Sequence, residues 1–524
     1  MAIRHTRRDI ILLLLGAVSM RLFTFFFYNP APLEMNIDTD HHSPPTQEVH
    51  HTTTVIEALT TTVTVTLKPE SRPRSTLDLA PQLPPTSLVA HAPGWTLFKN
   101  LYMSAGTLYI VTDTPSEFPK IRLMASNPLP AENTPQNIAM REPTAYNMAF
   151  LTPAQANRRW GDDVGQNRVF TIDGNTVLVN EPQQFLRHYY HLVAELMFGV
   201  QAFWHGAFAK PSFDVDREYV RGPHPAPPPI DRVMFARSSA DGWRDGPGFN
   251  AYFMRAAFPA TTIEVQEDWE DRVEITETGD RAFHFPQLLL TDRSASHRGA
   301  ICGSQTQRIA AEAVEYMRKR GQLVGIRVGG WWEPVRQKIL RFAGADTSFD
   351  AAGGESTQLP MPAKIVVTYI SRQSAGNRKL IPESHDGLVD ALRELVERKG
   401  PTWELNVVEA EKLTRDAQLQ IIARTTMLLG VHGNGLSHLV MMPPTRLSTV
   451  IEMFYPGGFA HDYQWTSRAL GMKHFAVWND TYRSEGIGEG KPRVNYPDGF
   501  QGNRIPVDGP TVAQLIENRV GGKL

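Results

Sequence analysis

A glycine-containing turn in the last quarter of the sequence has the residue types that bind a phosphorylated ligand. Residues 428–438, LLGVHGNGLSH, read as a strand, a turn and the start of a helix. Gly433 and Gly435 let the backbone approach a ligand closely, and the free N–H groups of the new helix attract an anion such as a diphosphate. Glu452 ends the next expected strand, where a carboxylate can hydrogen-bond ribose hydroxyls. The sequence predicts a nucleotide site made of His432, Gly433, Asn434, Gly435 and Glu452.

Two other interpretations of this turn stay open. In the first, the glycines make only a tight connection and Glu452 makes only a helix-capping contact. In the second, the ligand is NAD. A dinucleotide-binding turn normally has a third glycine, where this sequence has His438, and it normally follows the first strand of its domain. This turn follows the third expected strand, so both departures weaken the NAD interpretation without excluding it.

Two arginines follow another expected strand, over residues 364–370, at the sheet edge that faces the glycine turn. Arg372 comes directly after Ser371, and Arg378 follows six residues later. Two guanidinium groups can hold a diphosphate through charge-assisted hydrogen bonds and stabilise it as a leaving group without a metal ion. The alternative is that both arginines pair with surface carboxylates such as Glu383. We expect Ser371, Arg372 and Arg378 to bind the diphosphate.

A histidine and a glutamate lie one helical turn apart in a helix expected over residues 185–207. His191 and Glu195 are at positions i and i+4 and therefore share a face of the helix. The carboxylate can orient the imidazole or raise its basicity, which suits a general base that deprotonates a hydroxyl group. The alternative is an amphipathic helix in which His191 only caps or packs.

The elements that position these residues follow from the hydrophobic pattern. From Ala363 to about Asp480, strands alternate with helices over short connections, which indicates a parallel sheet covered on both faces. We expect a Rossmann-like region whose ligands bind at the carboxyl ends of the strands. Its expected strands cover residues 364–370, 404–408, 427–431, 449–454 and 474–478, and its expected helices cover 384–399, 413–424, 436–441 and 461–470. The less regular part before it has expected strands over 108–112, 168–171, 176–179, 232–236 and 287–291, and a second helix over 305–320.

The composition is that of a globular protein and narrows its partners. Among 524 residues, 41% are hydrophobic and the net charge is −2, whereas a nucleic-acid-binding protein needs a basic face. The single cysteine, Cys302, excludes an intrachain disulfide and a multi-cysteine metal site. Because Cys302 lies beside an expected helix, we expect it to be buried rather than catalytic.

The N-terminus indicates a membrane anchor followed by a stalk. Residues 10–28 are apolar except for Arg21, basic residues precede them in residues 1–9, and no further Lys or Arg occurs until Lys68. Such a helix spans about 28 Å, close to a thin bilayer, and the charge bias puts the tail in the cytosol and the body in the lumen. A cleaved signal peptide and a buried core helix are the alternatives. The Pro- and Thr-rich residues 29–93 predict an extended stalk.

The sequence offers little support for a metal ion. The D-x-D patterns Asp38–Asp40 and Asp214–Asp216 do not end apolar strands, so we interpret both as solvated surface and expect no metal cofactor. The tripeptide Asn479-Asp480-Thr481 is a glycosylation sequon, which is compatible with a luminal location.

These motifs together resemble a known family. The run VHGNGL over residues 431–436, followed by MMPP over 441–444 and VIE over 450–452, is similar to the C-terminal signature of glycosyltransferase family 61. The arginine segment and the His191 segment resemble that family's two other landmarks, in the same order, and the similarity extends over roughly residues 185–478. Two features depart from the family: Asn434 stands where an alanine is common, and the Pro-rich residues 223–229 form an unfamiliar insertion.

The resemblance implies an α/β fold of GT-B type, with two facing Rossmann-like domains, which we place at residues 94–340 and 341–524. It implies an inverting enzyme of the endoplasmic reticulum or Golgi membrane, related to protein O-linked N-acetylglucosamine transferases and plant β-1,2-xylosyltransferases. We expect it to transfer GlcNAc or xylose from a UDP-sugar to a hydroxyl of a glycan or glycoprotein, with His191 and Glu195 as the catalytic residues. An NAD-dependent oxidoreductase and a non-catalytic glycan-binding protein are the alternatives.

Overall fold

The computed structural model describes most of the sequence after the expected stalk. It covers residues 83–161, 168–211, 226–302, 309–323, 329–347, 359–484 and 493–524, all within one compact unit, Ser75–Leu524. The expected cytosolic tail, the expected anchor and both D-x-D patterns lie outside the described residues. Within the described ranges, no helix combines the length and apolar character that crossing a membrane requires.

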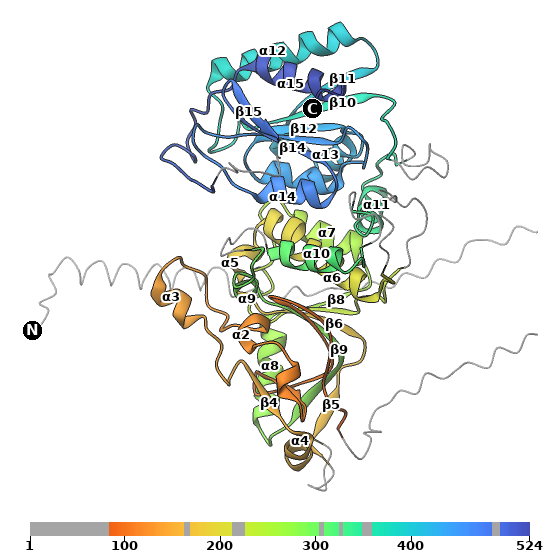
Figure 1. The fold of residues 1–524 in the computed structure, drawn as a ribbon, viewed down its shortest axis with the longest axis vertical. Helices are drawn as coiled ribbons and strands as arrows, with labels where there is room; N and C mark the ends of the chain where they lie inside the picture. The colour runs from red at the N-terminus through yellow and green to blue at the C-terminus, as the bar shows by residue number, and fades with distance from the viewer. Residues whose placement is uncertain are drawn as a thin grey trace, which may run out of the picture. The chain divides into compact units, whose positions relative to one another are not determined.

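Apolar runs form a parallel sheet in the C-terminal part of the chain (Figure 1). Its strands are β10 (Ile365–Ser371), β11 (Trp403–Glu409), β12 (Met427–Val431), β13 (Thr449–Met453), β14 (Lys473–Trp478) and β15 (Thr481–Ser484). The order is β11-β10-β12-β13-β14-β15, and only the pair β14–β15 is antiparallel. Every residue of β10 is buried, as a parallel strand covered on both faces requires.

Helices cover both faces of this C-terminal sheet. They are α12 (Pro382–Lys399), α13 (Arg415–Ile422), the 3₁₀ helix η6 (Asn434–Met441), α14 (Asp462–Ala469) and α15 (Gly509–Val520). Helices α12 and α15 pack together on one face (Figure 1), and their leucines join the core formed by alternate residues of β10, β12 and β13. The predicted alternation of strands and helices is confirmed in this part of the chain. Helix α15 was not predicted from the hydrophobic pattern. The helix expected over residues 436–441 is present, but it is the 3₁₀ helix η6.

The strand order creates a ligand-binding position at the neighbouring ends of β10 and β12. In chain order the parallel strands run 2-1-3-4-5, so the connections leave β10 and β12 in opposite directions across the sheet. Such a topological switch point opens a crevice at the carboxyl ends of the two strands. The residues that follow these ends are Arg372 and His432, so both predicted phosphate-binding segments begin at one point.

The N-terminal sheet is mixed rather than wholly Rossmann-like. Its described strands are β1 (Ser87–Ala92), β2 (Trp95–Ser104), β3 (Thr107–Val111), β4 (Met148–Leu151), β5 (Val169–Thr171), β6 (Asn175–Val179), β7 (Arg232–Phe235), β8 (Thr262–Glu264) and β9 (Ala282–Thr291). Strands β8-β7-β6-β9 are parallel and have the 3-2-1-4 order of half a Rossmann sheet. Strand β2 pairs antiparallel with β1, β3 and β9, which extends the sheet in a way that the family resemblance did not imply.

Five of the described strands, β1, β2, β4, β8 and β15, were not expected from the sequence, and β1 and β2 show why. The stalk boundary at residue 93 is wrong, because β1 already pairs with β2. Alternate residues of β1, Ala90 and Ala92, are buried, so this short run has a partner that the sequence did not reveal. Strand β2 was missed because the exposed Lys99 and the half-buried Asn100 interrupt its apolar pattern, and Asn100 has a φ of 56°.

The helix expected over residues 185–207 is divided into three pieces. Helix α5 (Gln183–Leu186) is followed by the π-helix η3 (Tyr190–Met197) and then by α6 (Phe198–Phe208). The other described helices of this part are α2 (Ile121–Met124), α3 (Pro135–Met140), α4 (Pro153–Trp160), α7 (Phe249–Ala257), α8 (Gln266–Glu277), α9 (Arg293–Ser296), α10 (Ile309–Lys319) and α11 (Glu333–Phe342), together with the 3₁₀ turn η1 (Pro115–Glu117). Because π-helices often occur at functional sites, η3 marks the segment that carries His191.

One hydrophobic core continues from the N-terminal sheet to the C-terminal sheet. Leu289 of β9 packs in this core, whereas its neighbours Leu288 and Leu290 face the opposite side of the sheet, where α8 packs. The same core includes Leu428 of β12 and Val450 of β13. The helices between these strands therefore bury apolar side chains against both sheets.

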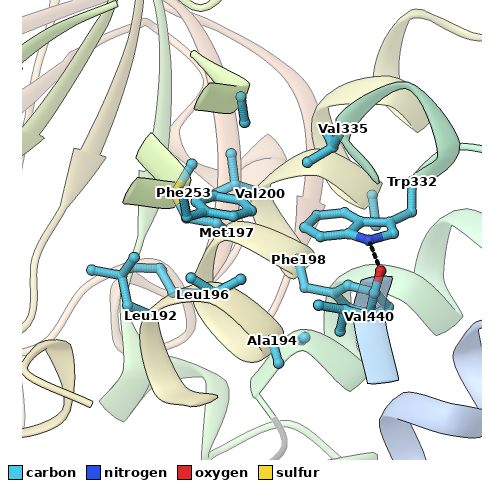
Figure 2. Packing of buried hydrophobic residues seen from close by; sticks show 14 of the residues in the cluster. Leu192, Ala194, Leu196, Met197, Phe198, Val200, Phe253, Trp332, Val335 and Val440 are labelled. Atoms are coloured by element: carbon cyan, nitrogen blue, oxygen red, sulfur yellow. Dashed lines mark hydrogen bonds between the residues drawn. The ribbon is translucent and has the colours of Figure 1, made fainter. Parts of the chain in front are cut away.

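Figure 2 shows a part of this core around η3 and α6. The indole Nε1 of Trp332 donates to the backbone carbonyl oxygen of Val440 in η6 at 2.8 Å, and the Phe198 ring packs against the Trp332 ring at a tilt of 57°. Cys302 belongs to the same core and is fully buried, as predicted. The segments that carry His191 and the glycine turn are thus held by one packed interior.

Candidate active site

Two guanidinium groups converge on the glycine turn at the switch point. A Cβ atom placed on Gly433 would lie 3.0 Å from Nη1 of Arg372 and 3.6 Å from Nη1 of Arg378. The absence of a side chain at Gly433 therefore leaves room for both arginines. A Cβ atom placed on Gly435 would lie 3.0 Å from Cγ2 of Ile370, so this second glycine lets η6 pack closely on β10.

The two arginines are held by neutral oxygens and not by carboxylates. Arg372 donates to the backbone oxygen and to Oδ1 of Asn377, both at 3.1 Å. Arg378 donates to the backbone oxygen of His432 at 3.2 Å and to Oε1 of Gln501 at 2.7 Å. Among the described residues neither arginine forms an ion pair, and burial together with the charge of Arg378 lowers the pKa of Arg372. The turn therefore carries uncompensated positive charge, which favours an anionic ligand.

Glu452 lies behind the turn, between two histidines. Its Oε1 is 2.5 Å from Nδ1 of His432, and its Oε2 is 2.7 Å from Nε2 of His474. The Glu452 side chain is completely buried. The expected contact between Glu452 and ribose hydroxyls is wrong for this arrangement, because both oxygens are occupied and neither faces solvent. Glu452 therefore lies beside the predicted turn, where its carboxyl group contacts His432 and His474.

Burial controls the charges of this group of three residues. Loss of hydration, and then the charge of Asp462, raises the pKa of Glu452 well above its ordinary value. Burial, and then the charges of Arg378 and Arg372, lowers the pKa of His432 well below its ordinary value, and burial lowers that of His474 to about 3. The raised pKa of Glu452 and the lowered pKa of both histidines favour the uncharged form of all three groups beside the arginines.

A second histidine–carboxylate pair comes from the N-terminal part of the chain. Nδ1 of His191 in η3 is 2.7 Å from Oε2 of Glu195, as the i, i+4 spacing predicted. Arg293 of α9 donates to the same Oε2 at 2.6 Å and also to Glu181 at 2.8 Å. Only 15% of the His191 side chain is exposed, and no more than 3% of each of the other three. Glu195 and Arg293 therefore hold the His191 ring in one orientation.

The pairing with Arg293 keeps Glu195 ionised. Burial alone would raise the pKa of Glu195, but the charge of Arg293 and the hydrogen bond from His191 outweigh it and lower the pKa to about 2. The same guanidinium also faces Glu181, whose pKa is raised by burial. We infer that Glu195 is the charged carboxylate of this group. An ionised Glu195 fixes the proton of His191 on Nδ1 and leaves Nε2 able to accept a proton.

The two histidine-bearing segments meet at the glycine turn. The backbone N–H of Tyr190 donates to Oδ1 of Asn434 at 3.1 Å. His188, one turn before His191, has its pKa lowered to about 4, first by partial loss of hydration and then by the charges of His191 and Arg378. The structure thus brings together the predicted arginines, glycine turn and His191 pair.

Several residues of this region were not found in the sequence analysis. The ring of His432 stacks on Phe454 and meets Tyr463 and Phe500 at centroid distances of 5.3 to 5.5 Å. Phe500 also lies under the guanidinium of Arg378. Phe500 and Gln501 come from a loop after β15 with no motif of its own, so no signal in the sequence pointed to them. For Arg293, the only signal was its position two residues after the end of strand β9.

A cavity of about 580 Å³ lies beside β10 and β11, and the residues on either side of Arg372, Ser371 and Gln373, line it. Ser371 lines it together with Asn406 and Glu409. Ser371 itself is buried, and its Oγ accepts a hydrogen bond from the backbone N–H of Gln373 at 3.3 Å. This cavity has both polar and apolar walls and the size of a nucleoside. In the described ranges no three His, Cys, Asp or Glu side chains are grouped to hold a metal ion.

One of two comparisons with known proteins identifies the family of the chain. No curated protein matches the chain. A sequence profile described as glycosyltransferase 61 matches residues 189–451, a range that includes His191, both arginines and the glycine turn. The profile covers half of the chain, from Tyr189, the residue before η3, to the third residue of β13. The chain therefore belongs to glycosyltransferase family 61 and has glycosyltransferase activity as its family function.

Proposed function

We propose that the protein is an inverting transferase that moves GlcNAc or xylose from a UDP-sugar to a hydroxyl of a glycan or glycoprotein. The observation that carries this proposal is the pair Arg372 and Arg378, both without a carboxylate partner among the described residues and both within 4 Å of one point beside Gly433. Guanidinium pairs match the oxygens of a diphosphate. The adjacent cavity that Ser371 lines accommodates the nucleoside.

The reaction is a single displacement at the anomeric carbon. The acceptor hydroxyl loses its proton to the catalytic base, and its oxygen forms a bond to the anomeric carbon as the bond to the β-phosphate oxygen breaks. The electron pair of the broken bond stays on UDP. Arg372 and Arg378 stabilise that developing charge, which electrostatic contacts in a water-poor site do effectively.

His191 is the base in this proposal. Its Nδ1 is fixed by the ionised Glu195, so Nε2 accepts the proton of the acceptor hydroxyl. His432 is the other histidine beside the arginines, but its strongly lowered pKa makes it a weak base. Its position next to Arg378 suits contact with the donor rather than proton abstraction.

The remaining parts of the proposal concern cofactors and location. The two arginines supply positive charge where other enzymes use a divalent cation, so we propose turnover without a metal ion. The apolar residues 10–28 support a single-pass type II anchor in the endoplasmic reticulum or Golgi membrane, with the enzyme body in the lumen.

The test is release of UDP by the purified full-length protein, offered UDP-GlcNAc, UDP-xylose and other UDP-sugars with glycan and glycopeptide acceptors. We expect turnover with one donor, unchanged by EDTA, and a product of inverted configuration at the anomeric carbon. The double variant Arg372→Ala/Arg378→Ala is the control and should release no UDP. Binding of NAD without UDP, or binding of a glycan without any turnover, would contradict the proposal.

A further inference from the structure

Asn434 joins the glycine turn to the helix that carries His191. Its Oδ1 accepts a hydrogen bond from the backbone N–H of Tyr190 at 3.1 Å and another from Oγ of Ser437 at 3.2 Å. Tyr190 is the first residue of η3, and Asn434 is the first residue of η6. One amide oxygen therefore connects the beginnings of two helices that are 244 residues apart in the sequence.

The neighbours of these two residues are the groups that the proposed reaction uses. Gly433, directly before Asn434, stands against Nη1 of Arg372 and of Arg378. His191 directly follows Tyr190 and holds its imidazole against Glu195. Each end of the hydrogen bond between Tyr190 and Asn434 is thus one residue away, along the chain, from a residue of the proposed reaction. These residues are Gly433, beside the arginines, and His191, the proposed base.

The amide of Asn434 is fixed in orientation by its partners. A backbone N–H can only donate, so the atom facing Tyr190 must be the oxygen, and the NH₂ group points elsewhere. The Asn434 side chain is half-buried, and its bond to Tyr190 is shielded because Tyr190 is almost completely buried. A shielded bond of this kind constrains the two segments more strongly than an exposed one.

We propose that Asn434 is a positioning residue that sets the distance between the base and the anomeric carbon of the bound donor. The inference rests on the proposed function, because it assigns one task within that site. Displacement of a catalytic group by about 1 Å can lower a rate by about a hundredfold, whereas donor binding depends on the arginines and not on this bond. Loss of the Asn434 oxygen should therefore lower kcat without lowering affinity for UDP.

The experiment compares Asn434→Ala with Asn434→Asp in the full-length protein. The alanine variant loses the acceptor, and we expect kcat to fall roughly tenfold or more while the Kd for UDP stays within about twofold. The aspartate variant keeps an oxygen where Oδ1 lies, so most of the kcat should return. Its added charge beside the diphosphate should raise the KM for the donor, which separates the two effects.

Trp332→Phe is the matched control. Trp332 also donates a hydrogen bond from the N-terminal part of the chain to η6, at the carbonyl oxygen of Val440 (Figure 2), but Val440 lies six residues beyond Asn434. This variant should lower the unfolding temperature and leave kcat within about twofold. An equal fall of kcat in Trp332→Phe and Asn434→Ala would show that Asn434 has only a structural role.

Exchange of the Tyr190 amide hydrogen provides a readout that needs no activity. Exchange should accelerate in Asn434→Ala and stay slow in Asn434→Asp and Trp332→Phe. The proposal is overturned by unchanged kcat in Asn434→Ala, by equal loss of kcat in the alanine and aspartate variants, or by weaker UDP binding in Asn434→Ala. Absence of turnover in the unaltered protein with every UDP-sugar overturns the proposed function itself. In that case, unchanged exchange of the Tyr190 amide hydrogen in Asn434→Ala separately overturns the proposed link between Asn434 and Tyr190.

Discussion

Nη1 of Arg378 donates a hydrogen bond to the backbone carbonyl oxygen of His432 at 3.2 Å. This bond ties the loop after β10 to the turn after β12, across the switch point of the C-terminal sheet. Arg378 has a φ of 56°, an uncommon backbone conformation for a residue with a side chain. The guanidinium is therefore held beside the glycine turn by its own backbone conformation and by its contact with His432.

Replacing Arg378 by Ala should weaken UDP binding. Hydrogen bonds to charged groups contribute about 1.5–3 kcal/mol, so we expect the Kd for UDP to rise roughly 10- to 100-fold in isothermal titration calorimetry. Arg393→Ala is the control, because Arg393 is exposed on α12 and pairs with Asp390 of the same helix. Equal affinities of both variants would remove Arg378 from the nucleotide site.

Replacing His191 by Ala should abolish most of the turnover and leave donor binding intact. General base catalysis contributes about 10²- to 10⁴-fold, so we expect kcat to fall by that factor while the Kd for UDP stays within about twofold. Glu195→Gln should cause a smaller fall, because the amide still holds the ring but no longer carries charge. Full activity of His191→Ala would assign the base to another residue, and His91→Ala in β1 serves as the control for loss of an imidazole.

Replacing Glu452 by Ala should destabilise the protein. The change leaves Nδ1 of His432 and Nε2 of His474 without their buried partner, which costs about 1–3 kcal/mol for each group. We expect a lower free energy of unfolding in urea denaturation, and a smaller loss in Glu452→Gln, because an amide can accept from one ring and donate to the other. If Glu452 instead bound the ribose, the alanine variant would keep its stability and lose UDP affinity.

Acid should destabilise the protein partly through His438. This side chain is buried in η6, and burial lowers its pKa from 6.5 to about 4. Between these values the unfolded chain binds a proton at His438 that the folded protein does not, so stability is lost as the pH falls through this window. His438→Gln should make the dependence of unfolding free energy on pH shallower by up to about 1.4 kcal/mol per pH unit. Identical slopes between pH 6.5 and 4 would contradict the assigned pKa.

Adding a methyl group to Gly433 should disturb the arginines. The new Cβ would lie 3.0 Å from Nη1 of Arg372, so this guanidinium must move and donor affinity should fall several-fold. Gly376→Ala is the matched control in the arginine loop, because its Cβ would meet no atom within 4 Å and its φ is not positive. The two Kd values for UDP, measured side by side, test whether the site needs the space at Gly433.

Elements in the C-terminal part were predictable because their pattern is local. Runs such as β12 are uniformly apolar, and the glycine turn and arginines follow strand ends directly, so chain order alone brings them to one edge. The pair His191 and Glu195 was predictable for the same reason, since one helical turn separates them. Each of these inferences needs only the period of a strand or helix.

Other features depend on contacts between distant segments. The role of Glu452 was misjudged because its surroundings come from His474 on the next strand, which the residues around Glu452 do not reveal. The bridge from Asn434 to Tyr190 and the contact of Phe500 with Arg378 join segments that are more than a hundred residues apart. The division of the helix over 185–207 into α5, η3 and α6 likewise has no counterpart in its apolar periodicity.

The core that spans both sheets also determines how the molecule can move. Trp332 and Val440 are buried in the same apolar interior that reaches Leu289 in one sheet and Leu428 in the other. A hinge between the two sheets would have to expose that interior to water, so wide opening and closing is energetically unfavourable. The sheet edge that carries Arg372 and Arg378 and the segment that carries His191 are then parts of one cooperative folding unit, and heat or denaturant should unfold both in a single transition.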